Sequence, residues 1–239
     1  MKIAGHTARV TSLFESTPQY LRDYLTEATP EFSITVTREN IDFEQADLRE
    51  EAHRDGFKPR VFTDPFLERA AIQRAFAEFL FDYDILLFHG SAVAVDGAGY
   101  LFTAHSGTGK STHTRLWKQV FGDRAVMVND DKPFLELAEG GVSLHGSPWS
   151  GKHGLDRNMT VPLKGICVLE RGAENSICSL SSQDALPMLR KQAYRPMDSA
   201  KEGQFLQLVE RLSVSLPLWK MACNRDPDAA TVAYNAMHK

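Results

Sequence analysis

The sequence predicts an α/β protein, with a small N-terminal α/β unit at residues 1–62 and a larger mixed-sheet domain at residues 63–239. Three observations support this prediction. Short apolar runs alternate with segments of helical spacing along the chain. Two of these runs flank the turn residues "DGAG", which favours an antiparallel hairpin and therefore a mixed sheet. The second run leads into the glycine-rich stretch "AHSGTGKST", which a helical segment follows.

The composition is that of an ordinary globular protein. The chain has 239 residues, of which 43% are hydrophobic and 24% charged, and its formal net charge is −4. This balance argues against nucleic-acid binding, and no apolar run approaches the roughly 20 residues of a membrane span. The start, "MKIAGHTARVTS", lacks the apolar core of a signal peptide, so we expect a cytoplasmic protein. The three widely spaced cysteines, Cys167, Cys178 and Cys223, are expected to be reduced, buried thiols.

The first unit combines strand-like and helical segments. "KIAGHTARVTSLF" and "FSITVT" are strand-like, and "TPQYLRDYLTEA" between them has a Thr-Pro start and helical spacing. The following segment, "EQADLREEAHRDGFKPR", is charged and punctuated by glycine and proline. We therefore expect a domain boundary near residues 55–65.

The second domain opens with a helix, for which Asp64 supplies an N-cap and Pro65 the first helical position. After it, "ILLFHGSAVAV" and "YLFTA" are expected to pair as the hairpin around "DGAG". Further strands are expected in "AVMVNDD", "FLELA", "GVSLHG", "GICVLERG", "NSICSLSS" and "LPLWKMAC". Helices are expected in "KSTHTRLWKQVF", "SQDALPMLRKQAY", "SAKEGQFLQLVERLSVS" and "DPDAATVAYNAMHK".

The glycine-rich stretch has the composition of a phosphate-binding P-loop. Gly107 and Gly109 can adopt positive φ values, so that several backbone N–H groups point into one concavity at the start of a helix. Lys110 adds a mobile positive charge for β- and γ-phosphates. The usual pattern begins with a glycine where this chain has Ala104. The expected phosphate-binding residues are Ser106, Gly107, Thr108, Gly109, Lys110, Ser111 and Thr112, of which Ser111 or Thr112 can also ligate Mg²⁺.

Two aspartates, Asp130 and Asp131, end the strand that follows the loop and its helix. One carboxylate in this place can hold Mg²⁺, and a second can accept the proton of an attacking hydroxyl group, as a kinase base does. The structural alternative is a turn that Asp131 forms with Lys132 and Pro133. Beside the glycine loop we favour the functional interpretation.

Two further regions offer residues that can contact a substrate. In the long polar loop "SPWSGKHGLDRN", Lys152 can neutralise a phosphate or an acidic acceptor, and Trp149 can form a wall of the site. The alternative is a surface loop with Trp149 packed on the core. Arg195, in "QAYRP", is either a cation of the arginine-finger type or a structural residue.

Residues 85–135 resemble a known family. "FHGSAVAVDGAGYLFTAHSGTGKST" followed by "VNDD" is similar to the catalytic domain of bacterial HPr kinase/phosphorylase, whose P-loop core is shared with ATP-dependent phosphoenolpyruvate carboxykinase. "HGSPWSGKHGLDRNMTVPLKGICVLERG" resembles the shorter HPr-kinase-related serine kinases. The family's glycine-rich signature after the aspartates and its HPr-docking segment have no counterpart here, so the resemblance does not extend to HPr as the acceptor.

The resemblance implies roles for individual residues. Nucleotide phosphates would lie on residues 106–112, with Mg²⁺ at Ser111. Asp130 would be the base or acid of phosphoryl transfer, and Asp131 would assist the metal or the substrate. His89 lies where the family has a histidine near its active site, although a histidine at the end of an apolar strand is equally typical of a core residue.

These observations predict an ATP- and Mg²⁺-dependent kinase with an aspartate general base. The expected acceptor is a hydroxyl group, first of all that of a serine, in a protein, a peptide or a small molecule. A non-catalytic ATP-binding sensor is the alternative. A decarboxylating carboxykinase is disfavoured, because the chain is short and no second metal site of His, Lys and Asp is evident. The number of subunits stays open, a homo-oligomer included.

Overall fold

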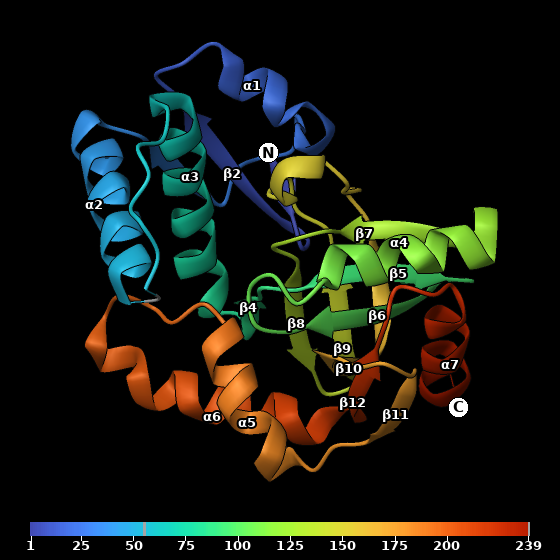
Figure 1. The fold of residues 1–239 in the computed structure, drawn as a ribbon. Helices are drawn as coiled ribbons and strands as arrows, with labels where there is room; N and C mark the ends of the chain where they lie inside the picture. Colours follow the sequence, from blue (N-terminus) through green and yellow to red (C-terminus); the bar gives the residue numbers. More distant parts are fainter. Residues whose placement is uncertain (55, 239) are drawn as a thin grey trace. The chain divides into compact units, whose positions relative to one another are not determined.

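The computed structural model describes residues 1–54 and 56–238 of the chain, which divides into two units, Met1–Phe79 and Leu80–Lys239 (Figure 1). The predicted boundary, between residues 62 and 63, lies earlier in the chain. The difference concerns one helix, α3 (Asp64–Phe81), most of which belongs to the first unit. In the described ranges, no helix has both the length and the apolar character that crossing a bilayer requires.

The first unit contains a three-stranded sheet of order β1-β2-β3, in which β1 is antiparallel and β3 parallel to β2. The helix expected in "TPQYLRDYLTEA" is present but short, because it ends after five residues and a single 3-10 turn follows it. The elements are β1 (Lys2–Ile3), β2 (His6–Thr11), α1 (Ser16–Tyr20), η1 (Arg22–Tyr24), β3 (Phe32–Thr35), α2 (Arg38–Arg54) and α3.

Helix α3 packs on residues of the first unit. The ring of Phe32 in β3 stacks on Phe79 with centroids 3.7 Å apart, and it meets Phe76 edge to face at 5.1 Å. The fully buried carboxylate of Glu68 accepts hydrogen bonds from the Thr17 hydroxyl group and from a backbone N–H group of the β2–α1 connection. The apolar side of α3 therefore has its partner in the first unit, which explains the later division of the chain.

Helix α2 lies largely in the charged segment "EQADLREEAHRDGFKPR", whose pattern predicts no helix or strand. Thr37 and Asn40 cap its N-terminus. Asn40 Oδ1 accepts the Thr37 N–H at 2.9 Å, and Thr37 Oγ1 accepts the Asn40 N–H at 3.4 Å. Arg74 of α3 pairs with both Glu44 and Asp47 at N–O distances of 2.6 Å. Capping and ion pairs to a neighbouring helix thus stabilise a segment that has no apolar run.

The second unit is built on a nine-stranded mixed sheet with the order β4-β8-β9-β10-β6-β5-β7, to which β12 and then β11 are added beside β10. The strands and helices expected in this unit are all present. The strands are β4 (Ile85–Leu87), β5 (Ser91–Val95), β6 (Ala98–Thr103), β7 (Ala125–Asn129), β8 (Phe134–Ala138), β9 (Gly141–His145), β10 (Thr160–Arg171), β11 (Ser176–Ser179) and β12 (Leu218–Cys223). The helices are α4 (Lys110–Phe121), α5 (Ser182–Gln192), α6 (Glu202–Ser215) and α7 (Asp228–Met237), and the 3-10 turns are η2 (Gly122–Arg124), η3 (Gly151–His153) and η4 (Ser199–Lys201).

The predicted hairpin is confirmed as β5 and β6, with φ values of 51° at Asp96 and 80° at Gly97 in its turn. Positive φ at both turn residues suits the right-handed twist of the two strands. Strand β7 pairs antiparallel with the other side of β5, so it runs parallel to β6. The start of β5 therefore lies at the same edge of the sheet as the ends of β6 and β7.

Side chains of the central strands alternate between two cores, one on each face of the sheet. Val93 and Val95 of β5 pack in one core with residues of α4 and α7. Ala92 and Ala94 of the same strand pack in the other core with residues of α5 and α6. Each face is thus covered by one pair of helices (Figure 1), which buries the β5–β6 hairpin inside the unit.

The three cysteines are free, as predicted. Cys167 is fully buried on β10, and burial raises the pKa of its thiol well above the ordinary value. The expectation that all three thiols are buried is wrong for Cys178, which is exposed. Within the part of the chain that the structure describes, its strand, β11, pairs with β12 alone, so it is an edge strand whose outward side chains face water.

Candidate active site

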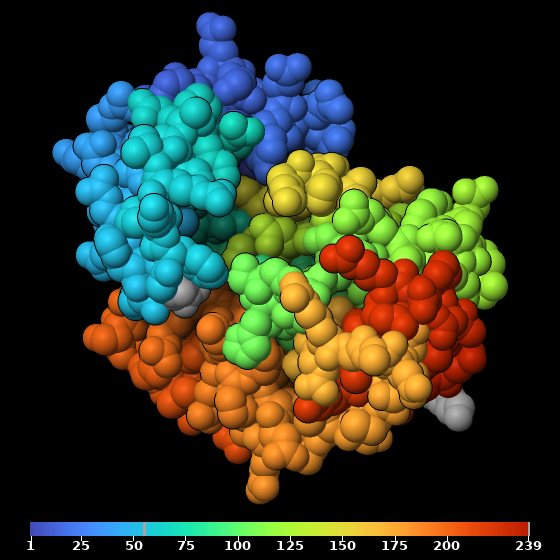
Figure 2. Space-filling view, viewed as in Figure 1, coloured from blue at the N-terminus to red at the C-terminus, as the bar shows by residue number. Residues whose placement is uncertain are grey.

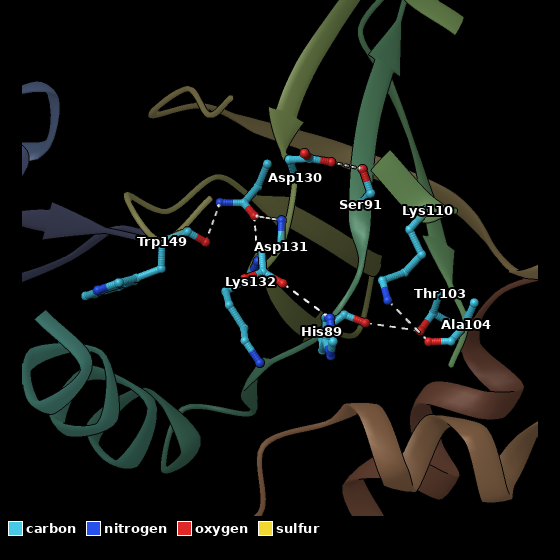
Figure 3. A network of polar contacts seen from close by, with 10 residues as sticks. His89, Ser91, Thr103, Ala104, Lys110, Asp130, Asp131, Lys132 and Trp149 are labelled. Carbon is cyan, nitrogen blue, oxygen red and sulfur yellow. Dashed lines mark hydrogen bonds and ion pairs between the residues drawn. The ribbon is translucent and has the colours of Figure 1, made fainter. Parts of the chain in front are cut away.

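Three chain segments meet at one edge of the large sheet (Figure 3). The start of β5 brings His89 and Ser91 to this edge, and the end of β6 leads into the glycine loop and Lys110. The end of β7 brings Asp130 and Asp131. Because β5 is antiparallel to both neighbours, its first residues face the last residues of β6 and β7. The hairpin expected before the loop is thus the feature that adds a third segment to the site.

The glycine loop, residues 104–109, has positive φ at both of its glycines. Its φ values are 77° at Gly107 and 125° at Gly109, as the sequence predicted. Among the described residues, none accepts a hydrogen bond from the N–H groups of Lys110, Ser111 and Thr112, which open helix α4. These N–H groups can donate hydrogen bonds to phosphate oxygens, and the positive end of the helix dipole adds an electrostatic attraction.

Lys110 points into the loop that precedes it. Its Nζ donates to the carbonyl oxygen of Ala104 at 3.3 Å, as Figure 3 shows. Burial lowers the pKa of Lys110, whereas the nearby carboxylates of Asp131 and Asp130 act in the opposite direction. The ammonium group thus lies beside the loop and within electrostatic range of both aspartates, where it can follow a bound polyphosphate.

Asp130 is buried, with 5% of its surface exposed, and its carboxylate turns toward β5. Ser91 Oγ donates to Asp130 Oδ1 at 2.6 Å and lies 2.7 Å from Thr114 Oγ1 of helix α4. Because Ser91 gives its one proton to the carboxylate, the Thr114 hydroxyl group donates to Ser91. This chain of hydroxyl groups ties Asp130 to the helix that begins at Lys110.

His89 is held by its main chain between two segments. Its N–H donates to the carbonyl oxygen of Gln192 at 2.8 Å, and its own carbonyl oxygen accepts the Thr103 hydroxyl at 3.1 Å. Burial, together with the ammonium groups of Lys132 and Lys110, lowers the pKa of His89 to about 2. The imidazole is therefore neutral at physiological pH.

Asp131 lies beside this neutral imidazole, with Oδ1 at 3.2 Å from His89 Nε2. A neutral ring with its proton on Nε2 can donate to the carboxylate and fix its orientation. Burial raises the pKa of Asp131, and the positive charges of Lys132 and Lys110 oppose this effect. Asp131 keeps 35% of its side chain exposed, so unlike Asp130 it is accessible to a substrate.

Asn129 organises the turn after β7, and sequence reasoning did not select it. Its Oδ1 accepts the N–H groups of Asp131 at 2.8 Å and Lys132 at 2.6 Å, while its Nδ2 donates to the Ser147 carbonyl at 2.8 Å. The Ser147 hydroxyl group donates to the Lys132 carbonyl at 2.6 Å. The signal in the sequence was the asparagine directly before the aspartate pair, since Asn side chains often accept from N–H groups two or three residues on.

Arg171, at the end of β10, is a second residue that sequence reasoning missed. Its Nη2 donates to the carbonyl oxygen of Gly107 at 2.7 Å. In the space-filling view (Figure 2) the green glycine loop lies at the surface, next to the orange turn that follows β10. Strand β10 is parallel to β6, so both strands end at the loop. The contact between Arg171 and the glycine loop could therefore be predicted only with knowledge of the β10–β6 pairing.

The polar loop "SPWSGKHGLDRN" does pass beside Asp131, but through its backbone. A Cβ atom at Gly151 would lie 3.3 Å from Asp131 Cβ. Trp149 is buried with 6% exposure, packs edge to face on Phe134 at 6.4 Å, and points its ring away from the aspartates (Figure 3). Lys152 is exposed on the turn η3. The structure therefore brings the loop to the site and leaves these two side chains at its margin.

Arg195 is engaged in contacts of its own. Its Nη2 lies 3.1 Å from Glu202 Oε1, and its guanidinium carbon lies 5.4 Å from the ring centroid of Phe205. Both partners belong to helix α6. These contacts correspond to the structural role that the sequence left open for Arg195.

A metal ion would need ligands beyond the protein at this edge. Within the described ranges, no three His, Cys, Asp or Glu side chains gather closely enough to hold one. The predicted donors, a hydroxyl group and one carboxylate, nevertheless suit Mg²⁺, which often takes one or two carboxylates together with waters and substrate phosphates. The donor set thus fits a metal that arrives with a nucleotide.

Comparisons with known proteins identify no family. No family model matches the chain, and no curated protein matches its sequence. A solved structure of the Hpr(Ser) kinase/phosphatase from Coxiella burnetii is similar to it, with 12% identity and a TM-score of 0.39 over 63% of this chain and 89% of that chain. At these values the likeness decides neither fold nor activity, so a proposal for this chain must rest on its own residues.

Proposed function

We propose that this chain is an ATP-dependent kinase that transfers the γ-phosphoryl group to a hydroxyl group of a protein, a peptide or a small molecule. The observation that carries the proposal is the convergence at one sheet edge of unpaired helix N–H groups, Lys110 and the pair Asp130 and Asp131. The first two elements are what a polyphosphate requires, and the carboxylates are what proton transfer and a divalent cation require.

The phosphates would bind the N–H groups of Lys110, Ser111 and Thr112 and the Lys110 ammonium group. Mg²⁺ would neutralise phosphate charge in the transition state, held by the Ser111 hydroxyl group, a carboxylate, phosphate oxygens and water. We assign this carboxylate to Asp130, in contrast to the sequence expectation. Its side chain is buried and tied through Ser91 to Thr114 of helix α4, so its position relative to the helix that follows the loop is fixed.

Asp131 then becomes the proton acceptor. It is more exposed than Asp130, and its raised pKa makes it a better base than an ordinary carboxylate. The neutral His89 ring orients it from one side. In the step, the acceptor O–H proton passes to Asp131, a bond forms between the acceptor oxygen and the γ-phosphorus, and the bond to the β-phosphate oxygen breaks. ADP leaves with that electron pair.

The test is incubation with γ-labelled ATP, Mg²⁺ and an extract of the source cells, followed by separation of protein, peptide and metabolite fractions. Label is expected in one of these fractions. Asp131→Asn is expected to lower transfer by about 10²- to 10⁴-fold with ATP affinity retained. Asp130→Asn is expected to remove the dependence of ATP binding on Mg²⁺. Asp123→Asn, a change at a fully exposed position, is the control.

Two outcomes would contradict the proposal in different ways. If the protein binds MgATP and labels nothing in any fraction, the non-catalytic sensor is the better description. If Asp131→Asn transfers phosphate as fast as the unchanged protein, the assignment of the base is wrong although the kinase activity stands.

A further inference from the structure

Lys132 lies directly after the aspartate pair, and its main chain is fixed on both sides. The N–H group donates to Asn129 Oδ1 at 2.6 Å, and the carbonyl oxygen accepts the Ser147 hydroxyl group at 2.6 Å. Both partner residues are fully buried. The lysine side chain therefore starts from a well-determined point at the site edge, although nothing in the proposed reaction has yet used it.

The Lys132 side chain lies within electrostatic range of His89 and Asp131. In Figure 3 it runs on the same side as His89, which lies between the ammonium groups of Lys132 and Lys110. The charge of Lys132 acts on the pKa of His89 and of Asp131, and in both cases its influence exceeds that of Lys110. Lys132 is thus a second ammonium group within electrostatic range of the proposed base, and it lies on the other side of His89 from Lys110 (Figure 3).

Neither ammonium group has an ion-pair partner among the described residues. Lys118, Lys201 and Lys220 of the same unit each have a carboxylate oxygen within 3.5 Å. By contrast, Lys110 has only the carbonyl of Ala104, and Lys132 has no carboxylate oxygen within ion-pair distance in this part of the chain. Two lysine charges facing one small region without ion pairs favour the binding of an anion between them.

We propose that Lys132 binds the γ-phosphoryl group as it is transferred, opposite Lys110. This inference rests on the proposed function, and it gives Lys132 the role that the sequence analysis considered for Arg195. Arg195 is paired with Glu202, whereas the ammonium group of Lys132 has no carboxylate partner among residues 1–54 and 56–238. In phosphoryl transfer the charge spreads over three equatorial oxygens, so a cation on the acceptor side adds to what Lys110 supplies from the donor side. Lys132 keeps its proton throughout.

The test compares the binding of ADP with that of a non-hydrolysable ATP analogue, both with Mg²⁺, by calorimetry. Lys132→Met is expected to weaken binding of the ATP analogue by about tenfold or more and to leave ADP binding nearly unchanged, because the contact is to the γ-phosphate alone. Lys132→Arg is expected to recover most of the preference for the ATP analogue. Lys110→Met is expected to weaken both ligands.

Lys164→Met is the matched control. Lys164 is exposed in the first half of β10, whose register places it near the start of β6 and therefore far from the loop. The Lys164→Met substitution removes the same charge as Lys132→Met, and it is expected to change the affinity neither for ADP nor for the ATP analogue. Thermal unfolding of Lys132→Met should match that of the unchanged protein, since only the side chain beyond its fixed backbone is altered.

Equal loss of both ligands in Lys132→Met, or no loss of either, would overturn the inference. This result can be separated from failure of the proposed function. If the unchanged protein binds the ATP analogue with the predicted sensitivity to Lys132 but transfers no label, the γ-phosphate contact stands and the kinase activity does not. If the unchanged protein binds neither nucleotide, both proposals are wrong.

Discussion

Replacing Asn129 with alanine is expected to lower the free energy of unfolding of the second unit by about 3–5 kcal/mol, because it removes the shortest hydrogen bonds of its carboxamide, to three polar groups. These groups are the N–H groups of Asp131 and Lys132 and the carbonyl of Ser147. A buried polar group that loses its partner costs about 1–3 kcal/mol. Ser147 is fully buried and bears the larger part, whereas the two N–H groups belong to half-buried residues and recover some of the cost from water.

Urea unfolding followed by tryptophan fluorescence measures this loss. All three tryptophans, Trp117, Trp149 and Trp219, lie in the second unit, so the signal reports that unit alone. Ser147→Ala removes one hydroxyl group and is expected to lower the free energy of unfolding by only about 1–2 kcal/mol. This smaller loss serves as a comparison for Asn129→Ala. A loss of less than about 1 kcal/mol in Asn129→Ala would refute the reasoning, since water would then replace the carboxamide at little cost.

Three other predictions concern the loop, the helix behind it and the first unit. Gly109→Ala places a Cβ at a φ of 125°, so nucleotide affinity, measured by calorimetry, is expected to fall by about tenfold or more. Burial lowers the pKa of His113 to about 4, so its protonation favours the unfolded state. The free energy of unfolding is therefore expected to decrease as the pH falls from 6.5 toward 4, by about 2.5 kcal/mol at pH 4.5. Between pH 7 and pH 4.5, the urea midpoint of His113→Leu is expected to fall less than that of the unchanged protein. Glu68→Leu leaves the Thr17 hydroxyl group unpaired and is expected to expose the first unit to proteolysis, with the tryptophan transition unchanged.

Local patterns were sufficient for the hairpin and the loop. The dipeptide Asp96-Gly97 favours positive φ at both positions, and Gly107 and Gly109 permit the turn that follows. Each of these features depends on neighbours within a few residues, so one sequence contains the information. The ends of β6 and β7 could also be predicted from local sequence, because the apolar run of each strand stops where polar residues begin.

Contacts between distant segments could not be predicted in this way. Nothing near Arg171 in the sequence indicates Gly107, because their hydrogen bond depends on the pairing of β10 with β6. The packing of α3 on Phe32 was missed for the same reason, since an apolar helix face does not reveal its partner. The accessibility of Asp131 relative to Asp130 also depends on Ser91, which reaches Asp130 from another strand.

The acid pair favours the proposed enzyme over a non-catalytic sensor on physical grounds. A protein that only binds a polyphosphate gains from Lys110 and the loop N–H groups, but two carboxylates within electrostatic range of the same lysine repel the ligand. A metal ion can offset the charge of Asp130, yet Asp131 would remain a cost to binding. A half-buried carboxylate with a raised pKa, oriented by a neutral His89, is useful where a proton must be accepted. The retention of ATP affinity and loss of transfer expected in Asp131→Asn measure this distinction directly.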